Sequence, residues 1–173
     1  MTRAIKFSLC VFSWFLGVYL SSLIEYVIPY VSKHYISQYD SMQFVEIFFY
    51  LLKTNGLVGL IISYLGYLTA GFITILILLF NGYLFGLSFF PFLKMPIMEQ
   101  EKYALLCKLF GHVPFEITAF CLFGILGLTG FNWFVNLFND KDLGLSLPRP
   151  KSLILPFAFL LIATILESYA IYR

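Results

Sequence analysis

The sequence has 173 residues, of which 61% are hydrophobic and 12% are charged, and its formal net charge is +2. Soluble proteins average about 45–50% apolar and about 25% charged residues, so this composition excludes an ordinary soluble domain and indicates a membrane protein. The 11 basic residues are dispersed along the chain, which argues against binding to nucleic acid. We therefore expect a single integral membrane domain over residues 1–173.

The first predicted element is a membrane helix from roughly Lys6 to Tyr30. Arg3 and Lys6 precede an apolar segment, as in a signal peptide, but no A-x-A cleavage site follows and the apolar segment is long enough to span. The sequence therefore predicts an uncleaved first span. Glu25, near its far end, is interpreted as an acid at the membrane interface.

The segment Met42 to Lys53 has apolar residues at helical spacing and polar residues on the opposite face. This pattern is compatible with a short helix in the plane of the interface. It is equally compatible with the exposed start of the next membrane span.

Residues 54–93 form a run of forty residues without a charge. Because one crossing takes about 20 apolar residues, this run is long enough for two spans. We expect the second span to open at Asn55, which could cap the helix, and to end near Leu68. Ala70-Gly71 is the expected break, and the third span should end near Phe90-Pro91.

Small residues in these two spans predict close helix packing. They are Gly56, Gly59, Gly66, Gly82 and Gly86. Asn81 lies within the third span, where its amide needs a hydrogen-bond partner. We expect that partner on a neighbouring helix.

Further along the chain, Met98 to Phe110 predicts a second amphipathic interfacial helix. The fourth span should begin at residues 111–116 and end near Leu137, and the last should cover Leu153 to Tyr172. The predicted fold is therefore an all-α polytopic bundle of about five transmembrane helices with one or two interfacial helices. Basic residues divide five against six between the two sides, which does not decide the orientation.

The sequence Gly111-His112-Val113-Pro114-Phe115-Glu116 contains the most unusual chemistry. Pro114 suits the first turn of a helix, and a spacing of four places His112 and Glu116 on one face. Such a pair could transfer a proton, activate water or supply two metal ligands. Two ligands are too few for a metal site, so the alternatives are catalysis, a buried polar network, and transport or partner binding.

Three other polar residues could join that network, namely Asn55, Asn81 and Glu167. Glu167 lies in an otherwise apolar span, where an ionisable residue indicates a functional site unless it reaches the nearby interface. Cys10, Cys107 and Cys121 lie in or beside apolar segments and form no CxxC motif, so we predict no disulfide framework, metal or cofactor.

The order of these motifs resembles the stage II sporulation protein M family. The resemblance covers roughly Leu51 to Ala170 and rests on four motifs: Asn55-Gly56, Phe80-Asn81-Gly82 with Gly86, His112 with Glu116, and Ala163 to Glu167. The family pattern is His-Gly-x-x-Glu with a proline after the glutamate. Here Val113 replaces that glycine and Pro114 precedes Glu116, so the local geometry at Glu116 is expected to differ.

The resemblance implies a multi-pass protein of the bacterial cell membrane. The founding member acts with partners in forespore engulfment, and short members occur in gene clusters for circular bacteriocins beside an ATP-binding protein. The first interpretation is therefore a non-enzymatic component, with an ATP-binding partner, in maturation, secretion or immunity of a hydrophobic peptide. The chain has no P-loop, so ATP would have to be used by a separate protein.

Two alternatives remain open. One is an intramembrane hydrolase or peptide ligase, with Glu116 as base, His112 as acid or ligand, and Asn81 or Asn55 as an oxyanion donor. The other is a scaffold for engulfment during sporulation.

Overall fold

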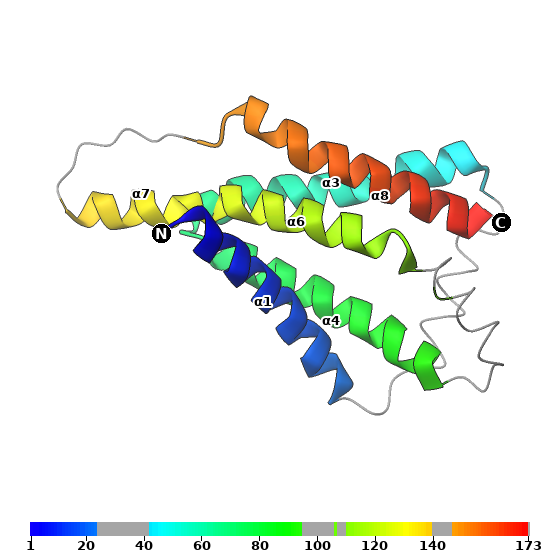
Figure 1. Ribbon diagram of the computed structural model, residues 1–173. Helices are drawn as coiled ribbons and strands as arrows, with labels where there is room; N and C mark the ends of the chain where they lie inside the picture. Colours follow the sequence, from blue (N-terminus) through cyan, green and yellow to red (C-terminus); the bar gives the residue numbers. More distant parts are fainter. Residues whose placement is uncertain (24–41, 95–105, 107–109, 140–146, 173) are drawn as a thin grey trace.

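The computed structural model describes residues 1–23, 42–94, 106, 110–139 and 147–172, and the regular structure in them is helical (Figure 1). The elements are α1 (Arg3–Ser22), α3 (Phe44–Leu68), α4 (Phe72–Lys94), α6 (Val113–Gly127), α7 (Thr129–Phe138), the 3-10 turn η1 (Pro150–Leu153) and α8 (Ile154–Tyr172). Five helical segments are long and apolar enough to cross a membrane, with α6 and α7 together forming the fourth. The predicted all-α membrane bundle is confirmed.

The two chain termini lie at opposite ends of the bundle (Figure 1). We name these ends the amino end, where Met1, the turn between α3 and α4, and η1 lie, and the carboxyl end, where Tyr172 and the first residues of α3 and α6 lie. The helices α1, α4 and α8 run from the amino end to the carboxyl end, and α3 and α6–α7 run back. Because five candidate spans alternate in direction, the two termini lie at opposite ends of the bundle.

The helix α3 begins earlier than predicted. The backbone N–H of Gln43 donates to the Glu46 carboxylate at 2.9 Å, and the helix continues without interruption from Phe44 to Leu68. Asn55 is therefore inside the helix, and its predicted capping role is wrong. The interfacial helix predicted for residues 42–53 is also wrong, and the alternative, the start of the second span, is confirmed. Its buried residues Ile47 and Leu51 pack near Ile171 of α8.

Two other predictions concern parts of the chain that the structure does not describe. Glu25 and the last third of the predicted first span lie outside the described residues. So does most of the predicted amphipathic helix from Met98 to Phe110.

The predicted break at Ala70-Gly71 is confirmed. Ala70 has φ 53° and Gly71 has φ 91°, so both are in the left-handed region. The Gly71 N–H donates to the Gly66 carbonyl at 2.7 Å, which satisfies an acceptor at the end of α3. A side chain at Gly71 would collide with Leu128. The chain thus reverses within a few residues against the junction of α6 and α7.

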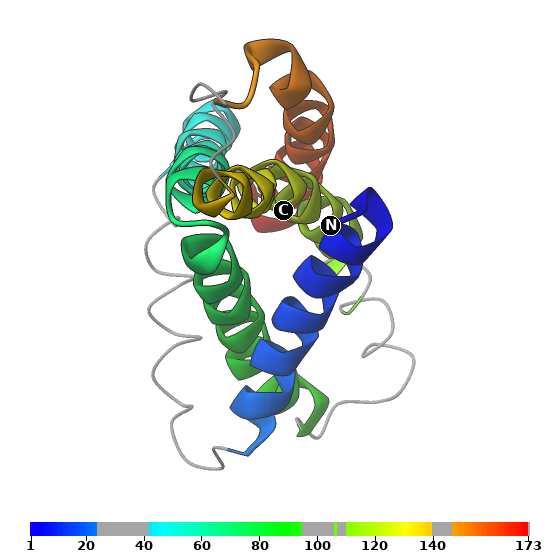
Figure 2. The same cartoon turned by 90° about the vertical axis from the view of Figure 1, so that its left-hand side faces the viewer.

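The helices α1 and α4 form a close parallel pair (Figure 2). A side chain at Gly82 would meet the backbone carbonyl of Trp14, and one at Gly17 would meet that of Leu79. A side chain at Gly86 would meet Ser21. The close approach predicted at Gly82 and Gly86 is confirmed, because a side chain at either position would collide with α1.

The helices α3, α6 and α8 form a second group, with α6 in contact with both others. Gly59 of α3 packs on the ring of Phe123, and that ring meets Phe157 of α8 edge to face with centroids 5.2 Å apart. The Sγ of Cys10 packs against Gly124 and so joins α1 to α6. The buried core contains Cys10, Ile62, Leu78, Ala119, Phe120, Cys121, Phe123, Leu128, Leu153 and Leu160.

Candidate polar site at the carboxyl end

His112 and Glu116 lie together where α6 begins. The backbone N–H groups of Phe115 and Glu116 both donate to the His112 carbonyl at 3.1 Å, so the first turn is formed around Pro114. This turn places both side chains on one face, as their spacing predicts. His112 Nε2 is 3.7 Å from Glu116 Oε2, which is ion-pair distance but longer than a hydrogen bond.

The surroundings of His112 determine its charge. Its side chain is 13% exposed and that of Glu116 is 25% exposed. Burial lowers the pKa of His112 to about 4, so the imidazole is neutral at pH 7. Its Nδ1 is buried and has no hydrogen-bond partner among the described residues. A neutral imidazole with its proton on Nε2, facing Glu116, has Nδ1 as an acceptor without a proton. Because the ring is neutral at pH 7, the predicted role of His112 as an acid is not favoured at that pH.

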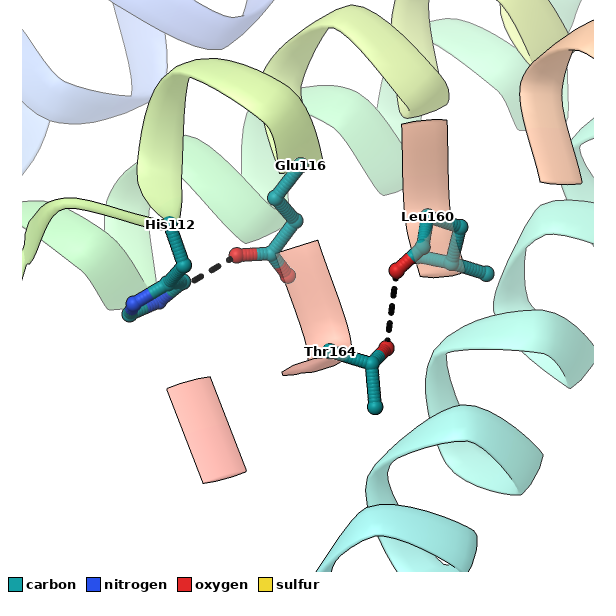
Figure 3. Close-up of polar contacts among 4 residues, drawn as sticks. All are labelled: His112, Glu116, Leu160 and Thr164. Atoms are coloured by element: carbon teal, nitrogen blue, oxygen red, sulfur yellow. Dashed lines mark hydrogen bonds and ion pairs between the residues drawn. The ribbon is translucent and has the colours of Figure 1, made fainter. Parts of the chain in front are cut away.

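The facing surface of the site belongs to α8 (Figure 3). Phe123 and Phe157 fix the antiparallel register of α6 and α8. Glu116 is seven residues before Phe123 and Thr164 is seven residues after Phe157, so Glu116 and Thr164 lie at the same level. Thr164 is fully buried, and its hydroxyl donates to the Leu160 carbonyl at 2.9 Å.

Glu167 lies one turn beyond Thr164, at the level of His112. It is only 9% exposed, and the hydroxyl of its neighbour Ser168 donates to the Thr164 carbonyl at 2.7 Å. A position on the buried face of α8 favours the functional interpretation of Glu167 over an acid that simply reaches water.

The two asparagines occupy different places. Asn55 is half-buried on α3, four residues from Leu51 and from Gly59, and therefore shares their inward face. Asn81 is half-buried on α4, and its amide donates to the Ile77 carbonyl of the same helix at 3.1 Å. The predicted bond to a neighbouring helix is thus replaced by one to the preceding turn, which an asparagine side chain can reach.

Within the described ranges, no group of three His, Cys, Asp or Glu side chains is arranged to hold a metal ion. His112 and Glu116 therefore form a two-residue polar pair, with Glu167 on the facing helix and Asn55 on the third helix of the group. Such an arrangement can bind a polar group or move a proton.

Several buried polar residues were not found from the sequence. Lys6 is 4% exposed, although the sequence presents it as a flanking charge. Its spacing from Cys10, Ser13 and Gly17 is the pattern of one small or polar helix face, and this pattern is the signal that indicates burial. Trp133 has a buried Nε1 without a hydrogen-bond partner among the described residues.

Comparisons with known proteins identify the family. No curated protein and no solved structure matches the chain. The sequence model of the family described as stage II sporulation protein M matches residues 5–170, nearly the whole chain. The protein therefore belongs to the stage II sporulation protein M family.

Proposed function

We propose that this protein is a non-enzymatic membrane component that acts beside an ATP-binding protein in the maturation, secretion or immunity of a circular bacteriocin. The observation that carries the proposal is the largely buried pair of His112 and Glu116, which lies in a helix group with an apolar core. Polar groups inside membrane bundles are costly to bury, and they mark substrate or ion pathways.

The chemistry of the pair suits a hydrophobic peptide. Such a peptide partitions into lipid, where its backbone amides and any charged group lack partners. The Glu116 side chain is 25% exposed, so its carboxyl can accept from a peptide N–H or pair with a peptide amine. These contacts would hold a bound peptide at the carboxyl end, beside α8.

The proposal is tested by peptide tolerance in a sensitive bacterium. We expect growth in the presence of the peptide to require both this protein and an ATP-binding protein. Glu116→Gln should reduce tolerance at least tenfold. The control Glu46→Gln alters an exposed acid whose glutamine can still cap α3, and it should retain tolerance. Full tolerance conferred by this protein alone would contradict the proposal.

Gene neighbourhood provides an independent check. A precursor-peptide gene next to the coding sequence supports peptide handling. Neighbouring sporulation genes would instead support an engulfment scaffold, in which the polar pair would only tie α6 to α8.

A second candidate function is an intramembrane hydrolase or peptide ligase. It is favoured by the 3.7 Å separation of His112 Nε2 and Glu116 Oε2, since catalytic contacts in unliganded enzymes are often long. Glu116 would be the base and neutral His112 would position it. Asn55 is the better oxyanion donor, because Asn81 would have to release the Ile77 carbonyl.

The two functions are separated by following cyclisation of the peptide by mass spectrometry. An enzyme requires the carboxylate, so Glu116→Gln should abolish conversion of linear to circular peptide. Complete conversion by this variant at normal expression would exclude the catalytic function and leave the binding function in place.

A further inference from the structure

Lys6 is a buried cation near the amino end of the bundle. It is 4% exposed and lies in the second turn of α1. No carboxylate of the described residues forms an ion pair with it. An ammonium group removed from water needs a counter-charge, so the surroundings of Lys6 should supply one.

Two contacts place the first turns of α1 against the end of α6 and the start of α7. The Sγ of Cys10 packs on Gly124, and the amino group of Met1 donates to Asn132 Oδ1 at 3.1 Å. In this antiparallel register Lys6 is level with Leu128, where α6 ends and α7 begins. Lys6 is also only about 5 Å along the helix axis from Arg3 at the start of α1, so its ammonium is close to the headgroup region.

The charges at this end have one sign among the described residues. The basic groups there are the amino terminus, Arg3, Lys6, Arg149 and Lys151. The described acids Glu46, Glu116 and Glu167 all lie at the carboxyl end. Arg3 is three residues before Lys6, so both project from the same side of α1.

We propose that Lys6 and Arg3 form a binding site for the phosphate group of an anionic lipid, between the first turns of α1 and the α6–α7 junction. Basic pockets between transmembrane helices bind anionic headgroups in this way. The long apolar stem of lysine packs along the helices while its ammonium meets the phosphate. This site is separate from the polar pair at the carboxyl end.

The choice of a lipid over free phosphate follows from the position. Lys6 lies inside the first candidate span, and its exposed neighbours on α1 include Ile5, Phe7 and Leu9. A headgroup attached to acyl chains can place its phosphate here while its chains cover those residues. A free phosphate ion would have no such apolar contacts.

The site can be tested by tryptophan quenching. The chain has two tryptophans, Trp14 and Trp133, so Trp14→Phe leaves a single reporter next to Asn132, which binds Met1. The protein is reconstituted in phosphatidylcholine vesicles that contain either brominated phosphatidylglycerol or brominated phosphatidylcholine at equal fraction. We expect the site to bind phosphatidylglycerol more tightly than phosphatidylcholine, by about fivefold for each of the two basic side chains, Lys6 and Arg3.

Variants show which residue is responsible. Lys6→Met should remove most of the preference for phosphatidylglycerol, and Lys151→Met, an exposed lysine at the same end, should keep it. Arg3→Gln, at an exposed position that does not depend on core packing, should lower the preference several-fold even if Lys6→Met does not fold.

Equal quenching by the two lipids, or an unchanged preference in Lys6→Met, would overturn the site. Loss of the preference on adding millimolar inorganic phosphate would assign the site to free phosphate and overturn the lipid assignment.

Discussion

At the residue scale, the two ring nitrogens of His112 have different surroundings. Nε2 faces Glu116 at 3.7 Å, and Nδ1 is buried without a described partner. Protonation would bury a charge and add an unpaired N–H at Nδ1, so burial favours the neutral imidazole. The low pKa of His112 is therefore a consequence of packing.

This pKa predicts how stability depends on pH. The pKa of His112 is about 4 in the folded protein and about 6.5 when unfolded. Between these values the unfolded chain binds a proton at His112 that the folded protein does not, so the contribution of His112 to the free energy of unfolding should fall as the pH decreases from 6.5 to 4. The loss should be at most on the order of 3 kcal/mol, and above pH 6.5 His112 should add no pH dependence.

Thermal unfolding in mild detergent at several pH values measures this effect. The free energy of unfolding of the wild type, relative to that of His112→Gln, should decrease from pH 6.5 to pH 4. A profile that is the same in wild type and His112→Gln would show that the imidazole is not buried in the neutral form.

The sequence predicts the pair but not its surroundings. A spacing of four is sufficient to place His112 and Glu116 on one face, because both belong to the same helix. Thr164 and Glu167 approach from α8, and their level relative to Glu116 depends on the contact between Phe123 and Phe157. Such a contact between distant segments has no signal in a single sequence.

At the element scale, the glycines of α1 and α4 set how closely these helices approach. The carbonyl of Trp14 occupies the place of a side chain at Gly82, whereas a side chain at Gly56 would meet Phe157 Cε1 at 3.4 Å, an ordinary contact. Gly82→Ala should therefore destabilise the protein by about 1–3 kcal/mol through overpacking. Gly56→Ala should be neutral or stabilising by up to about 1 kcal/mol, because alanine favours helix.

Thermal unfolding of the two variants in the same detergent compares them directly. They make the same chemical change in apolar helices and differ only in the space available. Equal stability of Gly82→Ala and Gly56→Ala would contradict the close contact of α1 with α4.

In the turn between α3 and α4, a change from alanine to glycine is expected to stabilise the protein. Ala70 adopts φ 53°, which costs a non-glycine residue about 1–2 kcal/mol. Ala70→Gly should remove this strain and, after the entropy lost by glycine, stabilise the protein by about 0.5–1 kcal/mol. The control Ala158→Gly, in the exposed interior of α8, should destabilise by about 0.5–1 kcal/mol. Destabilisation by both changes would show that Ala70 is not in the left-handed region.

The spans themselves could be predicted because their length and apolarity are local properties. The start of α3 is predicted only as one of two equal alternatives, because the Asn55-Gly56 pair resembles a cap more strongly than Gln43 and Glu46 do. The uncharged run begins at residue 54, but the helix begins ten residues earlier and includes Glu46 and Lys53 on its exposed side. A membrane helix can extend into the headgroup region, where such charges are satisfied.

At the scale of the whole molecule, the helices sort into a pair, α1 with α4, and a group of α3, α6 and α8 (Figure 2). Hydropathy gives the number of spans but not their neighbours, so this sorting could not be predicted. It separates Asn81, on the pair, from Glu116 and Glu167, on the group. The polar network expected from the sequence thus remains a prediction for Asn55, Glu116 and Glu167, whereas Asn81 is satisfied within its own helix.

The proposed function requires this membrane bundle to work with an ATP-binding protein on a hydrophobic peptide. This requirement is tested by affinity purification of the tagged protein from bacterial membranes in mild detergent, followed by an ATPase assay and identification of the purified chains. The account predicts a stable complex with an ATP-binding protein whose ATPase activity rises when the peptide is added, and predicts that Glu116→Gln keeps the complex but loses this stimulation. A protein that is recovered alone and protects vesicles from the peptide without ATP would contradict it.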